Sequence, residues 1–412
     1  MSALNSLAHL LILTFPNSTR LEELDLSHND LLSVQNLGTL SALSALDLSS
    51  NQLSKTEFSN VLLNMRSFKV SNNQLPSLDV GMFPSLTLLY TDQNRLFTIS
   101  GLERCHSLEI FSAREQTLSN EHNGGFFDVD LGLVKDVRKV FLSSNRLSMQ
   151  TLSPSVPLSS LQLLDVASCN IQTLPLDFAL NFPNLKVLNL NFNSLASVAE
   201  LVGLNCLARL TVAGNCIARL RKFCQVLSRL GRMNKSKVSS LQKVDTRGNP
   251  LTVRFYPPAI TGSGRDNKPD VKKLKAKEEE ESHPVTSPAA RKTGLDLPSV
   301  LADFSHCHEL SRIIGNDDDE DDDEIDSPEI DDPYTLPLAD VLADQKYVSR
   351  LDESTRLRRR VFELMLYAGT GGSLKFLDGL EMRPTLEEGS DMDRAWSRLE
   401  KLGVLKKKAI TG

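Results

Sequence analysis

The chain has 412 residues, of which 40% are hydrophobic and 24% are charged, and its formal net charge is −6. These values are typical of a protein with a sizeable folded core and an additional acidic region. They exclude a membrane-spanning chain, because no apolar run approaches the roughly 20 residues that a spanning helix needs, and residues 7–15 are apolar but lack the positive charge and cleavage site of a signal peptide.

One short pattern recurs along the first 250 residues. Leu185 to Leu195 reads LKVLNLNFNSL, which has the form L-x-x-L-x-L-x-x-N-x-L of a leucine-rich repeat core. Ten matches in nearly constant phase predict an α/β solenoid over residues 1–256, a leucine-rich repeat horseshoe with a parallel concave sheet and a C-terminal cap. The matches begin at Leu21, Leu43, Met65, Leu86, Leu108, Val137, Leu161, Leu185, Leu207 and Leu241.

The repeat explains the roles of most leucines and asparagines. In Leu188-x-Leu190 every second side chain points inward, which predicts a short strand. The amide of Asn193, once buried, has to bond the backbone of neighbouring turns, which predicts an asparagine ladder along the stack. Gln116 and Cys169 take the place of this asparagine in two repeats. We therefore interpret these residues as scaffold without a direct functional role.

A binding surface is expected at the three outward-facing positions of each repeat: just before the second leucine, between the second and third leucines, and just after the third. Large apolar residues occupy these positions in repeats four to eight, and polar residues occupy them at both ends of the stack. An apolar centre with a polar rim is typical of a protein-binding patch. Two alternatives stay open: the residues are scattered, or the long insertion at 108–137 covers them. The predicted protein-binding residues are Leu88, Tyr90, Ile110, Phe141, Leu163 and Val187.

Residues 218–237 follow the ninth repeat with apolar residues at helical spacing, which predicts a helix on the convex side. Between Arg219 and Lys243 there are eight basic residues and no acidic residue. This face is either solvated or contacts an acidic partner surface. Interleaved aromatic residues and a basic domain as a whole are both missing, so we expect no nucleic-acid binding.

Residues 257–333 differ from the repeats in composition. They contain KKLKAKEEEE and, further on, NDDDEDDDEIDSPEIDD. Such charge density prevents the burial of enough apolar surface for folding, which predicts a disordered acidic linker. Ser287 and Ser327 each precede a proline and are minimal proline-directed phosphorylation sites.

Ordered structure is expected again in residues 334–412. Residues 346–368 predict one helix with a basic stripe, which includes Arg359, and an apolar face. The segment SLKFLDGLEM at 373–382 predicts one more strand, which closes the solenoid. A final helix is expected at 391–405, and it carries Trp396, the single tryptophan of the chain.

The sequence contains no motif that indicates catalysis. Phosphate loops of the form GxxxxGK[ST], GxSxG elbows, HExxH and paired CxxC motifs are absent. The run His306-Cys307-His308 is a poor metal site, because three adjacent residues need distant partners to complete a coordination sphere. The six cysteines sit inside repeats or linkers, which favours reduced, intracellular thiols. We therefore expect no enzymatic activity, no catalytic residue, no metal and no cofactor.

Several segments together resemble a known family. They are residues 163–195, residues 207–230, GNPLTVRFYPP at 248–258, and LRRRVFELMLYAGTGGSLKFLDGL at 357–380 with AWSRLEKLGVL behind it. All are similar to segments of the fungal spindle-pole-body scaffold of the septation initiation, or mitotic exit, network, whose animal counterpart is centriolin. The resemblance spans nearly the whole ordered chain.

The resemblance implies a non-enzymatic, cytoplasmic scaffold at the spindle pole body, a microtubule-organising centre. Its implied partners are proteins: a spindle-pole anchor, a small GTPase module and downstream kinases that trigger mitotic exit and septum formation. No nucleic acid or membrane is implied. The family also carries a long Ser/Thr-rich region before the repeats, whereas this chain starts within the repeats, so the kinase-docking role of that region does not transfer.

Two other functions remain open at this point. One is a leucine-rich repeat regulatory subunit of a protein phosphatase, which holds a catalytic subunit in its concave face. Val253-Arg254-Phe255 approaches the V-x-F phosphatase-docking motif but lacks the preceding basic residue. The other is an RNA-associated or histone-binding leucine-rich protein, although such proteins carry their acidic run at the C-terminus and this chain carries it before the cap.

Overall fold

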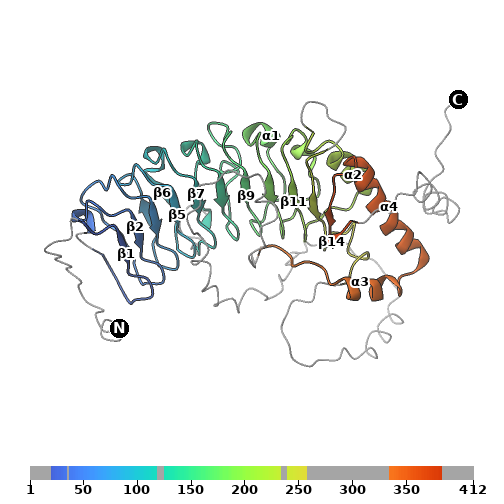
Figure 1. Cartoon of the computed structure of the whole chain (residues 1–412), viewed down its shortest axis with the longest axis horizontal. Helices are drawn as coiled ribbons and strands as arrows, with labels where there is room; N and C mark the ends of the chain where they lie inside the picture. Colours follow the sequence, from blue (N-terminus) through green and yellow to red (C-terminus); the bar gives the residue numbers. More distant parts are fainter. Residues whose placement is uncertain (1–19, 35–36, 118–124, 233–238, 258–333, 383–412) are drawn as a thin grey trace, which may run out of the picture. The chain divides into compact units, whose positions relative to one another are not determined.

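The computed structural model describes residues 20–34, 37–117, 125–232, 239–257 and 334–382. The predicted acidic linker with Ser287 and Ser327, and the predicted final helix at 391–405, lie outside the described residues. Within the described part, the chain forms a 12-stranded sheet with the order β1-β2-β3-β5-β7-β8-β9-β10-β11-β12-β13-β14 (Figure 1). The predicted fold class, a leucine-rich repeat solenoid with a parallel sheet, is confirmed.

Each of the ten repeat matches supplies one strand of this sheet at the predicted place. Neighbouring strands pair in parallel without a register shift, so that Leu188 lies between Leu164 and Leu210. Two further strands, β4 (Ser77–Asp79) and β6 (Thr98–Ser100), form a separate parallel pair. The ten strands are β1 (Glu23–Asp25), β2 (Ala45–Asp47), β3 (Ser67–Lys69), β5 (Leu88–Tyr90), β7 (Ile110–Ser112), β8 (Lys139–Phe141), β9 (Leu163–Asp165), β10 (Val187–Asn189), β11 (Arg209–Thr211) and β12 (Lys243–Asp245).

The predicted asparagine ladder joins one turn to the next. The Asn51 Nδ2 donates to the carbonyl of Leu26 in the preceding turn at 2.9 Å, and its Oδ1 accepts from the backbone N–H of Leu31 at 3.0 Å. Gln116 makes the equivalent bond to the preceding turn, since its Nε2 donates to the carbonyl of Thr91 at 3.0 Å. These bonds satisfy buried polar groups between turns, so the stack is stabilised as a whole and not turn by turn.

Cys169 keeps only part of this pattern. Its Sγ donates to the carbonyl of Leu142 at 3.3 Å, but a thiol is a weak donor and a weak acceptor compared with an amide. Burial raises the pKa of the Cys169 thiol to about 12. The thiol is therefore protonated at neutral pH and acts as a ladder residue, not as a nucleophile.

The residue before each ladder position adopts a left-handed conformation. Its φ is 54° at Asn72, 55° at Glu115 and 56° at Phe192. Gly214 occupies the same place in the next turn with φ 65°, and a Cβ there would lie 2.7 Å from the Phe192 ring. A side chain at 214 would therefore force the Phe192 ring to move, whereas the left-handed backbone itself is adopted by non-glycine residues at the equivalent positions.

The other side of each turn carries short helical segments over a core of leucine and phenylalanine. Phe58, Phe68 and Phe83 meet edge to face, with ring centroids 4.8 to 5.8 Å apart. Such contacts add directional packing to the burial of apolar area. The segments are η2 (Leu37–Thr39), η3 (Leu102–Arg104), η5 (Leu131–Leu133), α1 (Phe178–Asn181) and η6 (Ala199–Leu201).

The helix predicted at 218–237 is shorter than expected. It is α2 (Leu220–Leu227), which buries Phe223, Cys224 and Leu227. Residues 233–238 lie outside the described part of the chain. Helix α4 (Glu353–Gly369) lies beside α2 (Figure 1), so one face of the basic helix is covered by the cap.

Residues 341–369 form two helices where the sequence predicted one helix over 346–368, so that prediction was wrong. The first is α3 (Val341–Val348) and the second is α4. The Asp352 carboxylate accepts from the backbone N–H of Thr355 at 2.9 Å and caps α4. An aspartate cap favours a new helix start because it satisfies a backbone donor that a continuous helix does not leave free.

Arg359 is buried, which corrects its assignment to an exposed basic stripe. Its guanidinium donates to the Asp344 carboxylate at 2.7 and 2.8 Å, to Glu363 at 2.8 Å and to the carbonyl of Phe255 at 2.9 Å. Its Cζ also lies 4.4 Å from the ring centroid of Tyr256. One arginine therefore joins α3, α4 and the FYPP segment, and its charge is fully paired as burial requires.

Residues 373–382 form two short strands where the sequence predicted one closing strand. β13 (Phe376–Leu377) pairs in parallel with β12, and β14 (Leu380–Glu381) pairs antiparallel with β13. Asp378 lies between them, fully buried, and accepts from the Thr246 hydroxyl at 2.8 Å. Burial, with a contribution from the nearby Asp245 carboxylate, raises the pKa of Asp378 to about 7.

Candidate protein-binding face

Four of the six predicted binding residues lie in one row across the outer face of the sheet. The register places Leu88 beside Ile110, and Leu163 beside Val187. Lys139 lies between Ile110 and Leu163. All four apolar side chains are half-buried, so this row is an apolar surface that one cation interrupts. It remains a predicted site.

The other two predicted residues, Tyr90 and Phe141, lie in a second row with Ser112 between them. Both are half-buried. The Arg114 guanidinium lies over the Phe141 ring, with its Cζ 4.6 Å from the ring centroid. Phe141 therefore serves as a platform for a cation in this structure, and Tyr90 stands two residues after Leu88 of the apolar row.

A polar cluster adjoins this second row. Arg114 Nη2 donates to Asp165 Oδ2 at 2.9 Å, and the Ser143 hydroxyl donates to the same oxygen. Asp92 accepts from the Ser112 hydroxyl at 2.6 Å and from the Arg114 N–H at 2.7 Å. Burial raises the pKa of Asp92, and these two bonds and the Arg114 charge oppose the rise. The cluster fixes Arg114 next to a segment that leads into the cap.

That segment, Tyr334–Ala339, is named the strap here. The Tyr334 carbonyl accepts from Asn189 Nδ2 at 3.2 Å and from Asn191 Nδ2 at 2.9 Å. The Tyr334 hydroxyl donates to Glu115, and its ring centroid lies 5.5 Å from the Arg114 guanidinium. Figure 1 shows the strap as the orange chain that leads to α3. Tyr334, although distant in sequence, thus contacts repeats five to eight.

The remainder of the strap is held more loosely. Arg247 Nη2 donates to the carbonyl of Leu336 at 3.3 Å, and the Ala339 N–H donates to the carbonyl of Gly379 at 3.0 Å. Pro337 is exposed, and Leu338 is 60% exposed. Tyr334, at 3% exposure, is the one deeply buried side chain of the strap.

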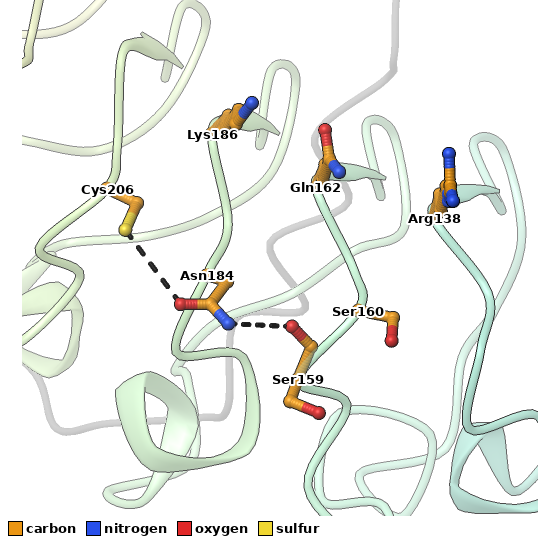
Figure 2. A pocket seen from close by; sticks show the side chains of 7 residues that line it. All are labelled: Arg138, Ser159, Ser160, Gln162, Asn184, Lys186 and Cys206. Atoms are coloured by element: carbon orange, nitrogen blue, oxygen red, sulfur yellow. Dashed lines mark hydrogen bonds between the residues drawn. The ribbon is translucent and has the colours of Figure 1, made fainter.

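A shallow hollow of about 500 Å³ lies near the starts of strands β8 to β10 (Figure 2). Asn184 Nδ2 donates to the carbonyl of Ser159 at 2.8 Å and ties two turns together. Arg138 and Lys186 rise from its rim on either side of Gln162. Its lining contains no carboxylate and no histidine, so it offers no general base for acid–base chemistry.

Other features bear on the functions that the sequence left open. Phe255 of the V-x-F tripeptide is 5% exposed and packs against Phe362 at a ring distance of 5.8 Å. A docking partner therefore has no access to that ring without opening the cap. Within the described ranges, no helix has the length and apolar character to cross a membrane. In the same ranges, no three His, Cys, Asp or Glu side chains are grouped as metal ligands.

Sequence reasoning missed Arg114, Asp165 and Tyr334. Arg114 and Asp165 both stand at outward repeat positions, with one strand of the sheet between theirs, so two opposite charges on one face were a readable signal. Tyr334 had no local signal, because its partners Asn189 and Asn191 lie more than 140 positions away. The outward positions therefore contain a polar site beside the predicted apolar row.

Comparisons with known proteins show what this chain is similar to. Residues 159–217 match the leucine-rich repeat family. The septation initiation network scaffold protein cdc11 of Schizosaccharomyces pombe is 40% identical over 247 residues, which cover 60% of this chain and 22% of that protein. The chain thus spans about a fifth of the length of the curated relative that it matches.

Among solved structures, similarity extends to the octameric complex of latrophilin 3, Unc5D and the leucine-rich repeats of FLRT2, with 22% identity, a TM-score of 0.45, and coverage of 56% of this chain and 73% of the other. It extends also to the functional domain of InlJ from Listeria monocytogenes, with 19% identity, a TM-score of 0.41, and coverage of 55% and 48%. The chain thus has the leucine-rich repeat fold, and over 60% of its length it is similar to the septation initiation network scaffold protein of Schizosaccharomyces pombe.

Proposed function

We propose that this protein is a non-enzymatic, protein-binding scaffold for septation initiation, or mitotic exit, signalling at the spindle pole body. The observation that carries the proposal is the 40% identity to a septation initiation scaffold over 247 residues. Those residues amount to more than half of the chain, and the described structure consists of the repeat sheet and its cap. Its role is to hold a spindle-pole anchor and the GTPase and kinase components of the network close together.

The proposed docking surface is the apolar row Leu88, Ile110, Leu163 and Val187, together with Tyr90. Half-buried apolar side chains on a rigid sheet lose little conformational entropy when a partner covers them. Phe141 contributes its edge, because its face is already occupied by Arg114. The phosphatase alternative receives no support from the V-x-F tripeptide, whose phenylalanine is buried in the cap.

The first test is the location of a fluorescently tagged full chain through the cell cycle. We expect paired dots at the spindle poles in mitosis, which coincide with a marker of the septation network. A diffuse signal at every stage contradicts the spindle-pole part of the proposal for this chain.

The second test separates the docking surface from the fold. Leu88→Glu combined with Ile110→Glu places two charges on the apolar row, and Leu180→Glu serves as the matched control, since Leu180 is 75% exposed on α1. We expect the double variant to lose spindle-pole recruitment and the control to keep it. Thermal unfolding is measured for both, because a melting temperature far below that of the control assigns these side chains to the core and not to a docking surface.

A further inference from the structure

The strap occupies its surface as a ligand does. It lies across successive turns of the sheet, it contributes one deeply buried side chain, and its other residues face solvent at Pro337 and Leu338. Side chains of the repeats bond two of its carbonyls and one hydroxyl, and its Ala339 N–H donates to the carbonyl of Gly379 in the cap. This is how an extended peptide is held on a preformed surface.

Three groups form a built recognition site for a tyrosine. Asn189 and Asn191, on neighbouring outward positions of one turn, both donate to the Tyr334 carbonyl. Asn191 is held in place by the backbone N–H of Ala213, which donates to its Oδ1 at 2.7 Å. Glu115 accepts from the phenol, and the left-handed backbone at Glu115 places its side chain at this edge.

The Glu115 carboxylate also defines what the site rejects. It binds the phenol as an acceptor, so it needs the phenolic proton. Burial and the bond to Glu115 raise the pKa of Tyr334 above its ordinary value, so the phenol keeps this proton at physiological pH. A phosphorylated tyrosine lacks the proton and places about two negative charges against the carboxylate.

The strap is anchored to the repeats mainly at this one tyrosine. Beyond it, Arg247 Nη2 donates to the Leu336 carbonyl at 3.3 Å, and the Ala339 N–H donates to the carbonyl of Gly379 in the cap at 3.0 Å. Pro337 has no N–H to donate, and a segment with one buried side chain and exposed backbone opens at a low free-energy cost. Exchange of the strap with an outside peptide is therefore compatible with an intact solenoid.

We propose that the outer face of repeats five to eight is a binding site for an extended peptide with an unphosphorylated tyrosine, and that the strap fills this site in cis. The site recognises a tyrosine by two groups: its main-chain carbonyl, which Asn189 and Asn191 bind, and its phenol, which Glu115 binds. A partner with such a peptide competes with the strap. The inference does not depend on the spindle-pole role, because it rests on contacts within this chain.

The test uses a fluorescently labelled peptide with the sequence of residues 331–340, DDPYTLPLAD, and the full chain. Peptide binding is measured by fluorescence anisotropy with the wild-type chain and with Tyr334→Ala, whose anchor is removed. We expect the Tyr334→Ala chain to bind at least about tenfold more tightly than the wild type, because its site is vacated. Adding Asn191→Ala to the variant chain should reverse this gain.

Two further peptides define the specificity. The peptide phosphorylated on its tyrosine and the peptide with Tyr334→Ala should both fail to bind the vacated site. Should Tyr334→Ala not fold, Tyr334→Phe removes only the phenol oxygen and gives a weaker gain in peptide binding. Equal binding to the wild-type and variant chains, or no binding to a folded variant, overturns the proposal, while loss of spindle-pole location alone bears only on the proposed function.

Discussion

The first three turns of the sheet and the turns of β8 to β11 share one strand geometry but differ in what covers them. At the third outward position, Ser27, Ser49 and Ser71 are half-buried in the first turns. At the same position, Ser143, Ala167, Asn191 and Ala213 have 0% exposure. Since strand pairing is the same in both regions, the difference comes from what lies above the sheet.

Repeat position alone therefore does not determine whether a side chain on the sheet face is accessible to a partner. The strap meets the sheet at Asn189 and Asn191 and reaches Glu115 with its tyrosine, so it covers the later turns and stops short of β1 to β3. The first outward row is half-buried from Ala45 in β2 to Arg209 in β11, and this includes Leu88 and Ile110. The proposed docking residues Leu88 and Ile110 lie in this first row, whereas Asn191 in the third row of the later turns is bonded to the strap.

Removal of Arg359, the buried arginine of the cap, is expected to have the largest effect on stability. Arg359→Ala leaves Asp344 buried without its guanidinium partner, which should lower the free energy of unfolding by roughly 3–5 kcal/mol. Arg360→Ala is the control, because the Arg360 side chain is 39% exposed and lies 3.7 Å from Glu363. We expect a change of less than about 0.5 kcal/mol for it. Urea unfolding of both variants measures the two effects, and equal losses contradict the buried role of Arg359.

The ladder residues give the next largest contrast. The Asn193 side chain bonds the carbonyls of Val166 and Leu190 at 2.9 and 3.0 Å and accepts from the N–H groups of Cys169 and Ile171. Asn193→Ala should therefore cost about 2–3 kcal/mol of unfolding free energy, since buried groups are left unsatisfied.

Asn29, in the first turn, is the matched residue. It is only partly buried, and its amide reaches carbonyls of its own turn, at Leu26 and Ser27. Asn29→Ala should cost under about 1 kcal/mol. Urea unfolding of both variants measures the two losses of unfolding free energy. A larger loss for Asn29→Ala than for Asn193→Ala contradicts the view that the ladder contributes more stability inside the stack than at its end.

The cap also makes the later turns sensitive to pH. The pKa of Asp378 is raised from 3.8 to about 7 by burial and by Asp245, so the folded state holds this proton more tightly than the unfolded state. Its contribution to stability is fully present below the unfolded pKa and is lost as the pH rises through about 7.

Asp378→Asn should flatten this part of the profile. The expected slope in the wild-type chain is at most about 1.4 kcal/mol per pH unit from this group. Urea unfolding at pH 4, 5.5 and 7 measures it in both chains. Parallel profiles for the variant and the wild type show that another group titrates in that window.

The features of the fold that recur in every repeat were predictable from the sequence, and the features that occur once were not. The phase of the leucines placed all ten strands, and the asparagines gave the ladder, because both follow from contacts between equivalent positions in adjacent turns. The division between α3 and α4 had a readable signal in Asp352, three residues before Thr355, but the apolar spacing on both sides outweighed it in the prediction.

The candidate site was predictable only in part. Leu88, Ile110, Leu163 and Val187 do lie in one row, because the register of the repeats places them there. The burial of Arg359 and the position of Tyr334 on the repeats depend on partners many positions away in the sequence. No local sequence pattern predicts such contacts.

The most direct test of a divided sheet face is the rate at which a thiol reagent modifies cysteines at equivalent positions. Ser49→Cys reports the early turns, and Ala167→Cys reports the turn beneath Tyr334, in a chain where Cys206, Cys216 and Cys307 are replaced by serine. We predict that Ala167→Cys reacts at least about tenfold more slowly than Ser49→Cys, and that Tyr334→Ala removes most of this protection. Equal rates at the two positions, or protection that survives Tyr334→Ala, contradict the claim that the strap divides the face.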